Sequence, residues 1–514
     1  DISLFHLFSF INDDPVRRAH LQDMSIMSWW ISPTFEWNFW RPLAELTHYI
    51  DYVWLKDYTW LMHIHSLVYF VIIVSLVYQL CLLIFQEHKL ALLITALYAF
   101  SATHGMTVAW LSNRNALLAL LFALISLITF IKSQQQSSYK QYALSLIFLI
   151  PALLAGEIAL SLGAFLFAYT VSLSTQSLSR GLCLLLPHLI IVIIWYSIYT
   201  QSGFGAHGNT LFYINPAQHP LTYLSLLIER IPAISVALLL ALPVDVLGNI
   251  PIITWPLMLI FLFLVIYIIR VFKHSAFKQQ AIFFSISGLI AILPIACSPP
   301  QSRNLVFVSL ASSAIVGLML LTLYQQKPSK SKSYILNTLL ILHLVLSPLL
   351  LLPSAYIPKL FSSAGETRAT SFTVASDDQV IVLDADMMEL TYLAATLFKQ
   401  GAVMPNRIWN ITGAGADYSI EKIDDYRLRL QAQEHFLNEA DLLVRNIEAE
   451  PFASGDSITM NGLTIDIMTV DEAGLPVVFE ATFSKKLSQL KIMQWQKAGY
   501  KSLSLQEMLD HFKN

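Results

Sequence analysis

Long apolar runs dominate the chain between Leu61 and Pro353. Each run is roughly 15–24 residues long, enough for an α-helix to cross a hydrocarbon core of ~30 Å. The composition agrees, because only 13% of the residues are charged, against about a quarter in soluble domains, and the mean hydropathy is +0.60. We therefore expect an all-α, multi-span membrane bundle. The runs predict about ten spans, at residues 62–85, 90–104, 114–131, 141–155, 158–173, 182–199, 254–272, 280–297, 304–324 and 333–353.

The charged residues between the spans predict how the bundle is oriented. Lysine and arginine fall in alternate short loops, and the positive-inside bias places these loops in the cytoplasm. They are Lys132, Lys140, Arg180, Arg270, Lys273, Lys278, Lys327, Lys330 and Lys332. The alternation holds only if the apolar stretch 221–243, which contains Glu229 and Arg230, does not cross or crosses twice. We predict a surface or re-entrant helix there.

Residues 1–60 are polar and rich in aromatic side chains. Tryptophan prefers the membrane interface, where its ring is half buried and its N–H meets water. The segment contains Trp29, Trp30, Trp37, Trp40, Trp54 and Trp60. We expect it to form a first periplasmic loop with interfacial helices. Because the chain opens on a polar loop at Asp1, we expect one further span to precede it.

After about Ser362 the composition becomes that of a soluble domain. Short alternations of apolar and polar residues predict strands, and Asn461-Gly462 is a typical hairpin turn. The predicted strands are 379–384, 407–411, 426–431, 457–460, 463–470 and 477–483, and the predicted helices are 387–400 and 439–445. We therefore divide the chain into the loop 1–60, a transmembrane domain 61–360 and a periplasmic α/β domain 361–514.

Three simple features narrow the class of protein. The formal net charge is −3, and the chain has no basic stripe interleaved with aromatics that would predict nucleic-acid binding. Cys81, Cys183 and Cys297 lie within apolar runs, so we expect small core residues rather than disulfides or metal ligands. No long internal repeat is evident, which weakens a transporter interpretation.

Ionisable residues gather at the outer ends of the predicted spans, where a buried charge indicates a functional site. Arg41 stands just before a predicted helix, which leaves its guanidinium at the membrane surface as a phosphate ligand or as an ordinary snorkelling side chain. His104 and Arg114 can converge on one outer turn, and Glu157 and Arg303 lie in turns on the same side. Each residue alone suits a structural role, but together they form a candidate anion-binding site.

Two other pairs are less informative. His63 and His65 begin one span, and because a helix turns about 200° over two residues, they do not share a face and do not predict a zinc site. We expect a single polar contact for one of them. Asp384-Ala-Asp386 is expected to end a strand and to cap the following helix rather than to bind a metal.

The first 25 residues of this loop carry four acidic residues, which are Asp1, Asp13, Asp14 and Asp23. From loop chemistry alone, Asn12-Asp13-Asp14-Pro15 is most simply a helix-capping turn. The alternative is that one of these carboxylates acts as a general base or helps to hold a metal ion.

A series of short motifs resembles those of a known family, in the same order over residues 1–355. They are Arg41-Pro42-Leu43, Asp51, His63, His104 with Val108 and Trp110, Arg114 with Leu117 and Leu118, Gly156-Glu157-Ile158-Ala159, and Ser302-Arg303-Asn304-Leu305. The series resembles the GT-C class of polytopic glycosyltransferases, especially the branch related to tetratricopeptide-linked O-mannosyltransferases. The chain departs from the family where Ser66 and Phe70 replace a motif Asn and His, where Glu157 lacks a preceding Lys, and where Arg303 lacks a preceding Glu.

The resemblance implies a GT-C-like bundle in a bacterial inner membrane, with its active site and C-terminal domain in the periplasm. It implies an inverting transfer of a sugar from a polyprenyl-phosphate donor to a periplasmic glycan, lipid or protein acceptor. A first-loop acid is the expected base, with Asp1 preferred and Asp13 or Asp14 second. The groups expected at the lipid phosphate are Arg41, His63, His104, Arg114 and Arg303, with Glu157 orienting one of them.

Some features of this activity stay open in the sequence. A divalent metal, Mg²⁺ or Mn²⁺, fits the acidic loop as well as a metal-free site does. One alternative function is a flippase or transporter of lipid-linked sugars, which buried mid-span charges or symmetric halves would favour. The other is a catalytically inactive scaffold with the GT-C fold, which the missing motif partners favour.

Overall fold

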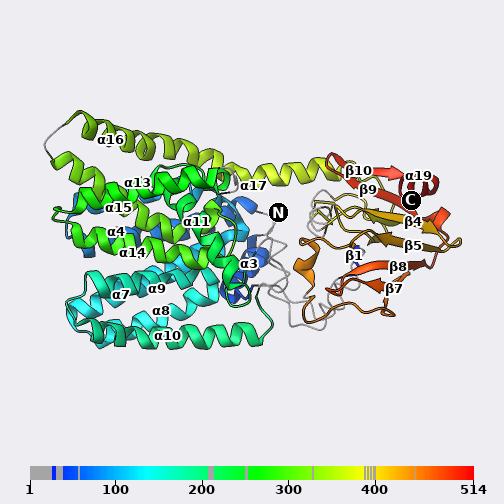
Figure 1. The fold of residues 1–514 in the computed structure, drawn as a ribbon, viewed down its shortest axis with the longest axis horizontal. Coiled ribbons are helices and arrows are strands. Elements are labelled where there is room, and N and C mark those ends of the chain that lie inside the picture. Colours follow the sequence, from blue (N-terminus) through cyan, green and yellow to red (C-terminus); the bar gives the residue numbers. More distant parts are fainter. Residues whose placement is uncertain are drawn as a thin grey trace. The chain divides into compact units, whose positions relative to one another are not determined.

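The computed structural model describes residues 26–30, 39–55, 58–205, 213–248, 253–326, 329–386, 389–390, 393, 396–397, 401–445 and 447–513. The chain forms two compact units, one helical and one rich in strands (Figure 1). The helical unit comprises 39–202 and 212–358. The α/β unit comprises 359–514 together with the described parts of two earlier segments, 26–30 and 203–205.

The helical unit follows the predicted pattern of spans. Its helices are α3 (Pro42–Leu55), α4 (Thr59–Phe85), α5 (His88–Ala99), α6 (His104–Ala109), α7 (Arg114–Gln136), α8 (Tyr139–Ala155), α9 (Leu162–Ser172), α10 (Leu178–Gln201), α11 (Pro220–Leu239), α12 (Val244–Leu247), α13 (Thr254–Phe272), α14 (Lys278–Ile295), α15 (Val306–Gln325), α16 (Lys330–Ile341) and α17 (Ser347–Ala369). A helix covers most of each predicted span, and eight described helices are long and apolar enough to cross a membrane. The prediction of a multi-pass, helical membrane protein is confirmed.

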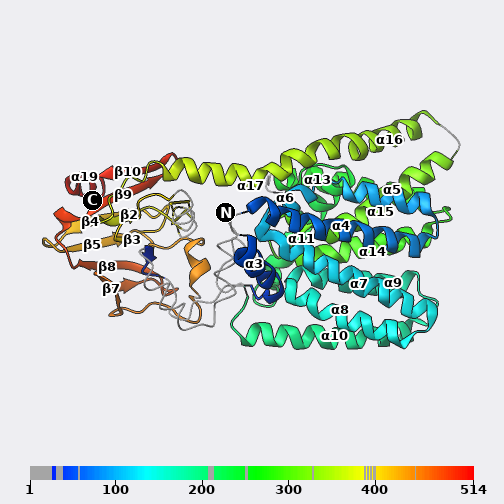
Figure 2. The ribbon, with the colours of Figure 1, turned by 180° about the vertical axis from the view of Figure 1, so that it is seen from behind.

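The long helices of this unit run alongside one another in both views (Figures 1 and 2). Helices α7 and α15 are buried along most of their length, because apolar residues surround each of them on all sides. Short loops make consecutive spans antiparallel, so the basic loops gather at one end of the bundle. The turns that contain Arg41, Glu157 and Arg303 lie at the opposite end, where Figure 2 also shows α3 and α6.

Helix α11 is apolar enough to cross a membrane, but its contacts place it along one end of the bundle. The Tyr223 hydroxyl, near the start of α11, donates to the carbonyl of Leu293 in the last turn of α14 (2.7 Å). At the other end of α11, His343 forms a hydrogen bond with the carbonyl of Leu239 (3.0 Å). His343 lies one helical turn before Ser347, which accepts a hydrogen bond from the backbone N–H of Ala102 in the turn after α5. Both ends of α11 therefore lie near the end that carries Arg41, as the loop charges predict.

The α/β unit contains two five-stranded sheets. The mixed sheet has the order β1-β3-β2-β9-β10, in which β10 alone is antiparallel to its neighbour. The second sheet is antiparallel, with the order β4-β5-β8-β7-β6. The strands are β1 (Ile26–Ser28), β2 (Gln379–Leu383), β3 (Arg407–Asn410), β4 (Tyr418–Lys422), β5 (Arg427–Ala432), β6 (Ser457–Met460), β7 (Leu463–Val470), β8 (Pro476–Phe483), β9 (Lys491–Gln496) and β10 (Gly499–Leu503).

The interfacial role expected for the tryptophans is wrong for two of them. Strand β1 pairs with β3, and the adjoining Trp29 and Trp30 are 2% and 0% exposed in the core of the α/β unit. The Trp29 Nε1–H donates to the carbonyl of Ile411 (3.1 Å), and its ring packs on Phe452 and Phe479. An aromatic pair suits a core as well as an interface, and only the pairing with a distant strand distinguishes the two.

All six predicted strands are confirmed, as β2, β3, β5, β6, β7 and β8. The hairpin turn at Asn461-Gly462 is confirmed too, and Gly462 has a positive φ of 87°. The helix expected at 439–445 is wrong, because the segment forms a single 3₁₀ turn at Asp441–Val444. The helix expected at 387–400 lies partly outside the described residues.

Two smaller expectations can also be checked. Asp386 accepts a hydrogen bond from the backbone N–H of Glu389 (2.8 Å), so the predicted capping role after β2 is confirmed. The three cysteines are free, and Cys81 is buried as expected, whereas Cys183 is exposed on its helix.

Candidate functional site

The first polar cluster joins three segments that are far apart in sequence. Arg41 precedes α3, Glu157 starts the 3₁₀ turn between α8 and α9, and Tyr199 lies near the end of α10. The Arg41 Nη2 and Nε lie 2.9 and 3.0 Å from Glu157 Oε2, and the Tyr199 hydroxyl donates to Oε1 (3.1 Å). The two charged side chains are 18% and 22% exposed, so the pair is accessible but partly desolvated.

Neighbouring rings and charges connect this cluster to Arg303. The Arg41 guanidinium stacks 4.3 Å from the Phe39 ring centre, and Phe39 packs on Tyr213 (5.1 Å). Burial raises the pKa of Tyr213, whereas the positive charges of Arg41 and Arg303 both lower it. Burial alone would lower the pKa of Arg41, but Glu157, Tyr213 and Tyr199 together outweigh burial, and the pKa is raised. Tyr213 is thus within electrostatic reach of both arginines.

Arg303 is fixed by the turn that contains it. Its Nε–H donates to Gln301 Oε1 (2.5 Å), and its guanidinium lies 4.6 Å from the Trp110 ring centre. Its carbonyl accepts from Thr107 (3.2 Å) and from Asn113 Nδ2 (3.1 Å). These contacts hold the 3₁₀ turn Ser302–Asn304 against α6 and the start of α7.

The second polar cluster is buried between α3, α4 and α7. Asp51 and Arg114 are 3% and 0% exposed at their side chains, and Arg114 Nη2 lies 2.5 Å from Asp51 Oδ2. Arg114 also donates to Ser66 Oγ (3.0 Å), to the Met62 carbonyl (3.0 Å) and to the Thr47 carbonyl (3.4 Å). The contacts of Arg114 therefore all lie inside the bundle, and its predicted role at a lipid phosphate stays a prediction.

His65 extends this cluster along α4. Its Nδ1 lies 2.7 Å from Asp51 Oδ1, and its Nε2 lies 2.7 Å from the Tyr69 hydroxyl. His63 is exposed on another face of α4. The expectation of a polar contact for one of the two histidines is confirmed for His65. The partners were not predicted, although the spacing of four between His65 and Tyr69 places them on one helix face.

The two clusters adjoin, and His104 lies apart from both in a set of aromatic rings. A Cβ atom on Gly156, next to Glu157, would lie 3.1 Å from Nδ2 of Asn115, the residue after Arg114. His104 is 1% exposed and packs against Tyr98 (4.4 Å) and Phe70 (5.3 Å between ring centres). Its role as a phosphate ligand, like that of His63, stays a prediction.

The predicted catalytic residues Asp1, Asp13 and Asp14 lie outside the described residues. The structure therefore leaves the identity of the base as a prediction. Across the described part of the chain, no three or more His, Cys, Asp and Glu side chains gather as a metal site would require. Asp1, Asp13, Asp14 and Asp23 lie outside the described residues, so a divalent metal also stays a prediction.

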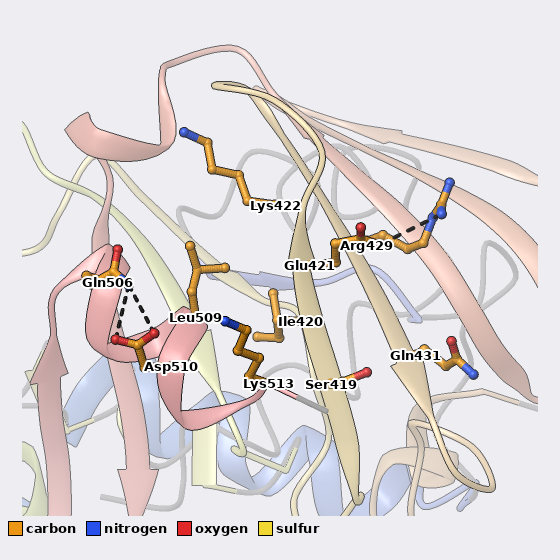
Figure 3. A pocket seen from close by; sticks show the side chains of 10 residues that line it. All are labelled: Ser419, Ile420, Glu421, Lys422, Arg429, Gln431, Gln506, Leu509, Asp510 and Lys513. Atoms are coloured by element: carbon orange, nitrogen blue, oxygen red, sulfur yellow. Dashed lines mark hydrogen bonds and ion pairs between the residues drawn. The ribbon is translucent and has the colours of Figure 1, made fainter.

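A pocket of about 480 Å³ opens in the α/β unit, between β4, β5 and α19 (Leu505–His511) (Figure 3). Cations and carboxylates alternate around it, and Arg429 lies 3.9 Å from Glu421 across the two strands. The mixed charge favours neither an anion nor a cation. None of the predicted site residues lines it; the lining residues are Ser419, Ile420, Glu421, Lys422, Arg429, Gln431, Gln506, Leu509, Asp510 and Lys513.

Comparison with known proteins adds one distant likeness. No family model matches the chain, and no curated protein matches it either. The chain is similar to the crystal structure of ArnT from Cupriavidus metallidurans bound to undecaprenyl phosphate. The sequence identity is 12%, the likeness covers 76% of this chain and 83% of that one, and the TM-score is 0.40. A likeness of this size does not establish a shared activity.

Proposed function

We propose that this protein is a membrane glycosyltransferase of the GT-C class. It transfers a sugar from a polyprenyl-phosphate-linked donor to a periplasmic glycan, lipid or protein acceptor, with inversion at the sugar. The observation that carries the proposal is the Arg41–Glu157 pair with the Tyr199 hydroxyl on it, at the end of the helical bundle where the charges of Arg41 and Arg303 both lower the pKa of Tyr213. The relation to tetratricopeptide-linked O-mannosyltransferases stays a prediction.

The chemistry of the leaving group requires such a site. Displacing a sugar from a polyprenyl phosphate turns a phosphodiester monoanion into a more highly charged phosphate monoester. Fixed cations beside that phosphate stabilise the charge as it develops. Arginine suits this role because its planar fork binds two phosphate oxygens at once, and Glu157 holds the fork of Arg41 in one orientation.

The acceptor hydroxyl must lose a proton as it attacks the anomeric carbon. A first-loop carboxylate supplies the base in this proposal, with Asp1 preferred over Asp13 and Asp14. Mg²⁺ or Mn²⁺, if required, would further neutralise the leaving phosphate. The alternation of basic loops supports a bacterial inner-membrane location with the site and the α/β unit in the periplasm.

The test is transfer of label by the purified full-length chain in lipid nanodiscs. The donors are radiolabelled undecaprenyl-phosphate mannose, glucose and galactose, with a cell-envelope extract as acceptor, each with and without EDTA. We expect label to move from one donor to the extract, and to stop moving in Asp1→Asn or in Asp13→Asn/Asp14→Asn. Folded protein that transfers no label from any donor would contradict the proposal, and donor that crosses the bilayer intact would indicate a flippase.

Arginine variants test the site itself. Arg41→Gln and Arg303→Gln are expected to slow transfer strongly, because each removes a charge from the proposed phosphate site. The matched control is Arg180→Gln. Arg180 is exposed in the first turn of α10, at the opposite end of the same bundle. Equal activity in all three variants would remove the phosphate site from the proposal.

A further inference from the structure

The turn that carries Arg303 is supported by α11 and α12. The Asp245 carboxylate, on α12, accepts hydrogen bonds from the backbone N–H of Ser302 (3.0 Å) and from the Ser302 hydroxyl. We propose that Asp245 is a positioning residue that fixes Arg303 for the phosphate of the lipid-linked donor, and that α11 and α12 hold the turn in place for it. The inference deepens the proposed function and rests on it.

Asp245 caps the 3₁₀ turn Ser302–Asn304 from outside. The first N–H groups of such a turn have no partner within it, and a carboxylate is a strong acceptor for them. Ser302 is 7% exposed, so its polar groups would be only poorly solvated if the carboxylate were removed. Asp245 comes from a helix 57 positions earlier in the chain. The cap therefore fixes where the turn lies as well as its shape.

Two further contacts join α11 and α12 to the chain just before Arg303. The Arg230 Nη1, on α11, donates to the carbonyl of Ala296 (2.5 Å). Gly248 ends α12, and a Cβ atom there would lie 2.5 Å from the Cβ of Pro300, so only a glycine permits this close approach. The segment α11–α12, whose composition suits a membrane span, is thus packed against this turn along its length.

The backbone around Arg303 is held from two directions. Asp245 holds Ser302, the residue directly before Arg303, whereas Thr107 (3.2 Å) and Asn113 Nδ2 (3.1 Å) donate to the Arg303 carbonyl from α6 and the turn before α7. Loss of Asp245 would release the first of these two points and leave the second. The Arg303 side chain could then shift about the contacts that remain.

The same stretch of chain is joined to the segment that carries Tyr213. The backbone N–H of Ile214 donates to the carbonyl of Cys297 (2.8 Å). Burial raises the pKa of Tyr213, and the charges of Arg41 and Arg303 both lower it. The position of the turn therefore decides how Arg303 lies relative to the side of the site that carries Arg41.

Positioning matters here because of what the arginine is proposed to do. A cation stabilises the leaving phosphate best when it is already in place as the charge develops. A displacement of about 1 Å can lower the rate roughly 10²-fold. A residue that holds Arg303 therefore acts on kcat without touching the donor, and Asp245 takes no proton in the transfer.

A double-mutant cycle tests whether Asp245 acts through Arg303. The variants are Asp245→Ala and Asp245→Asn, each alone and each combined with Arg303→Gln, all in the full-length chain in nanodiscs. The probe is the undecaprenyl-phosphate sugar that the wild type uses, titrated at fixed acceptor to give kcat and KM. The matched control is Asp471→Ala, since Asp471 likewise accepts from two backbone N–H groups (2.8 and 2.9 Å) but lies in the α/β unit.

We expect Asp245→Ala to lower kcat by about 10- to 10²-fold, with a smaller change in KM. Asp245→Asn keeps one acceptor oxygen and is expected to lose less. Neither substitution should lower kcat further when Arg303 is already glutamine, because the group that it positions is then missing. The control is expected to keep the wild-type kcat.

Two results would overturn the inference. Losses that multiply in the double variants would mean that Asp245 only stabilises the fold, and an unchanged kcat in Asp245→Ala would mean that Arg303 needs no such support. If Asp245→Ala does not fold, the Asp245→Asn cycle decides in the same way. A wild type that transfers no label from any donor would instead contradict the proposed function, and the inference would fall with it.

Discussion

At the scale of single residues, the buried ion pair between Asp51 and Arg114 joins three helices at the end of the bundle that carries Arg41. Removing two charges from water is costly, so such a pair persists only where further hydrogen bonds satisfy both groups. Arg114 has three such partners on α3 and α4, and Asp51 has His65. The pair therefore fixes α3 against α4 and α7.

Asp51→Asn is expected to destabilise the folded protein by about 3–5 kcal/mol, because it leaves Arg114 buried without its counter-charge. Asp424→Asn is the matched control, since Asp424 pairs with Arg427 on the exposed surface, where solvent screens the pair and its loss changes stability little. Thermal unfolding in detergent micelles, followed by circular dichroism, measures both. Equal melting temperatures for the two variants would contradict the structural importance of the buried pair.

The substitution Arg41→Lys tests whether donor binding depends on the planar guanidinium fork of Arg41 or only on its positive charge. Arg41→Lys keeps the charge but cannot contact Glu157 and a phosphate with two parallel bonds. We expect the KM for the lipid-linked donor to rise about 10-fold or more, since a charge-assisted hydrogen bond contributes roughly 1.5–3 kcal/mol, with a smaller change in kcat. Donor titration at fixed acceptor measures the two constants. A lysine variant with the wild-type KM would show that Arg41 acts as a simple charge.

The sequence predicted some contacts between site residues and missed others, because only some of them follow from local sequence features. Arg41 and Glu157 were placed on one side of the membrane by loop charge, and they are in direct contact. Asp51 and His65 were not paired, because their contact depends on the angle between α3 and α4, which a periodicity does not encode. Tyr69 could have been found from its spacing of four after His65.

At the scale of elements, the spans were predictable because each is set by its own local apolar run. The long strands of the α/β unit were predictable from alternation in the same way. Strands β4, β9 and β10 were missed because they carry many polar residues and are held by pairing with neighbours. Helix α11 shows the opposite case, since its composition suits a span and only the charges of distant loops predict otherwise.

Cysteine labelling tests the placement of α11. In a background without the native cysteines, Val246→Cys follows α11 and Lys273→Cys follows α13. If α11 makes either no crossing or two crossings, a membrane-impermeant maleimide will label position 246 in intact spheroplasts. It will then reach position 273 only after permeabilisation. Labelling of position 273 from outside would contradict the assigned orientation of α13 and with it the alternation of basic loops.

At the scale of the whole molecule, the α/β unit is assembled from distant parts of the chain. Trp29 and Trp30 precede the helical unit in sequence, yet they belong to the core formed mostly by residues after 380. Such non-local pairing has no signature in a single sequence. The boundary expected at residue 361 therefore describes only the later part of this unit.

Trp29→Ala is expected to destabilise the α/β unit by about 3–5 kcal/mol, the usual cost of truncating a buried aromatic ring. Trp54→Ala is the control, because Trp54 is 71% exposed on α3. Hydrogen exchange measured by mass spectrometry should show faster exchange in β3 and β8 for the first variant alone. Unchanged protection of these strands would contradict the pairing of β1 with β3.

The central claim is that the chain separates a sugar from its polyprenyl phosphate. One time course measures this directly, with the wild type in nanodiscs and an undecaprenyl-phosphate sugar that carries ³H in the sugar and ³²P in the phosphate. The account predicts that ³H appears in the acceptor as an equal amount of ³²P appears in free undecaprenyl phosphate, and that Arg41→Gln and Arg303→Gln slow both together. If the two labels stay on one molecule with every donor, the chain is not a glycosyltransferase.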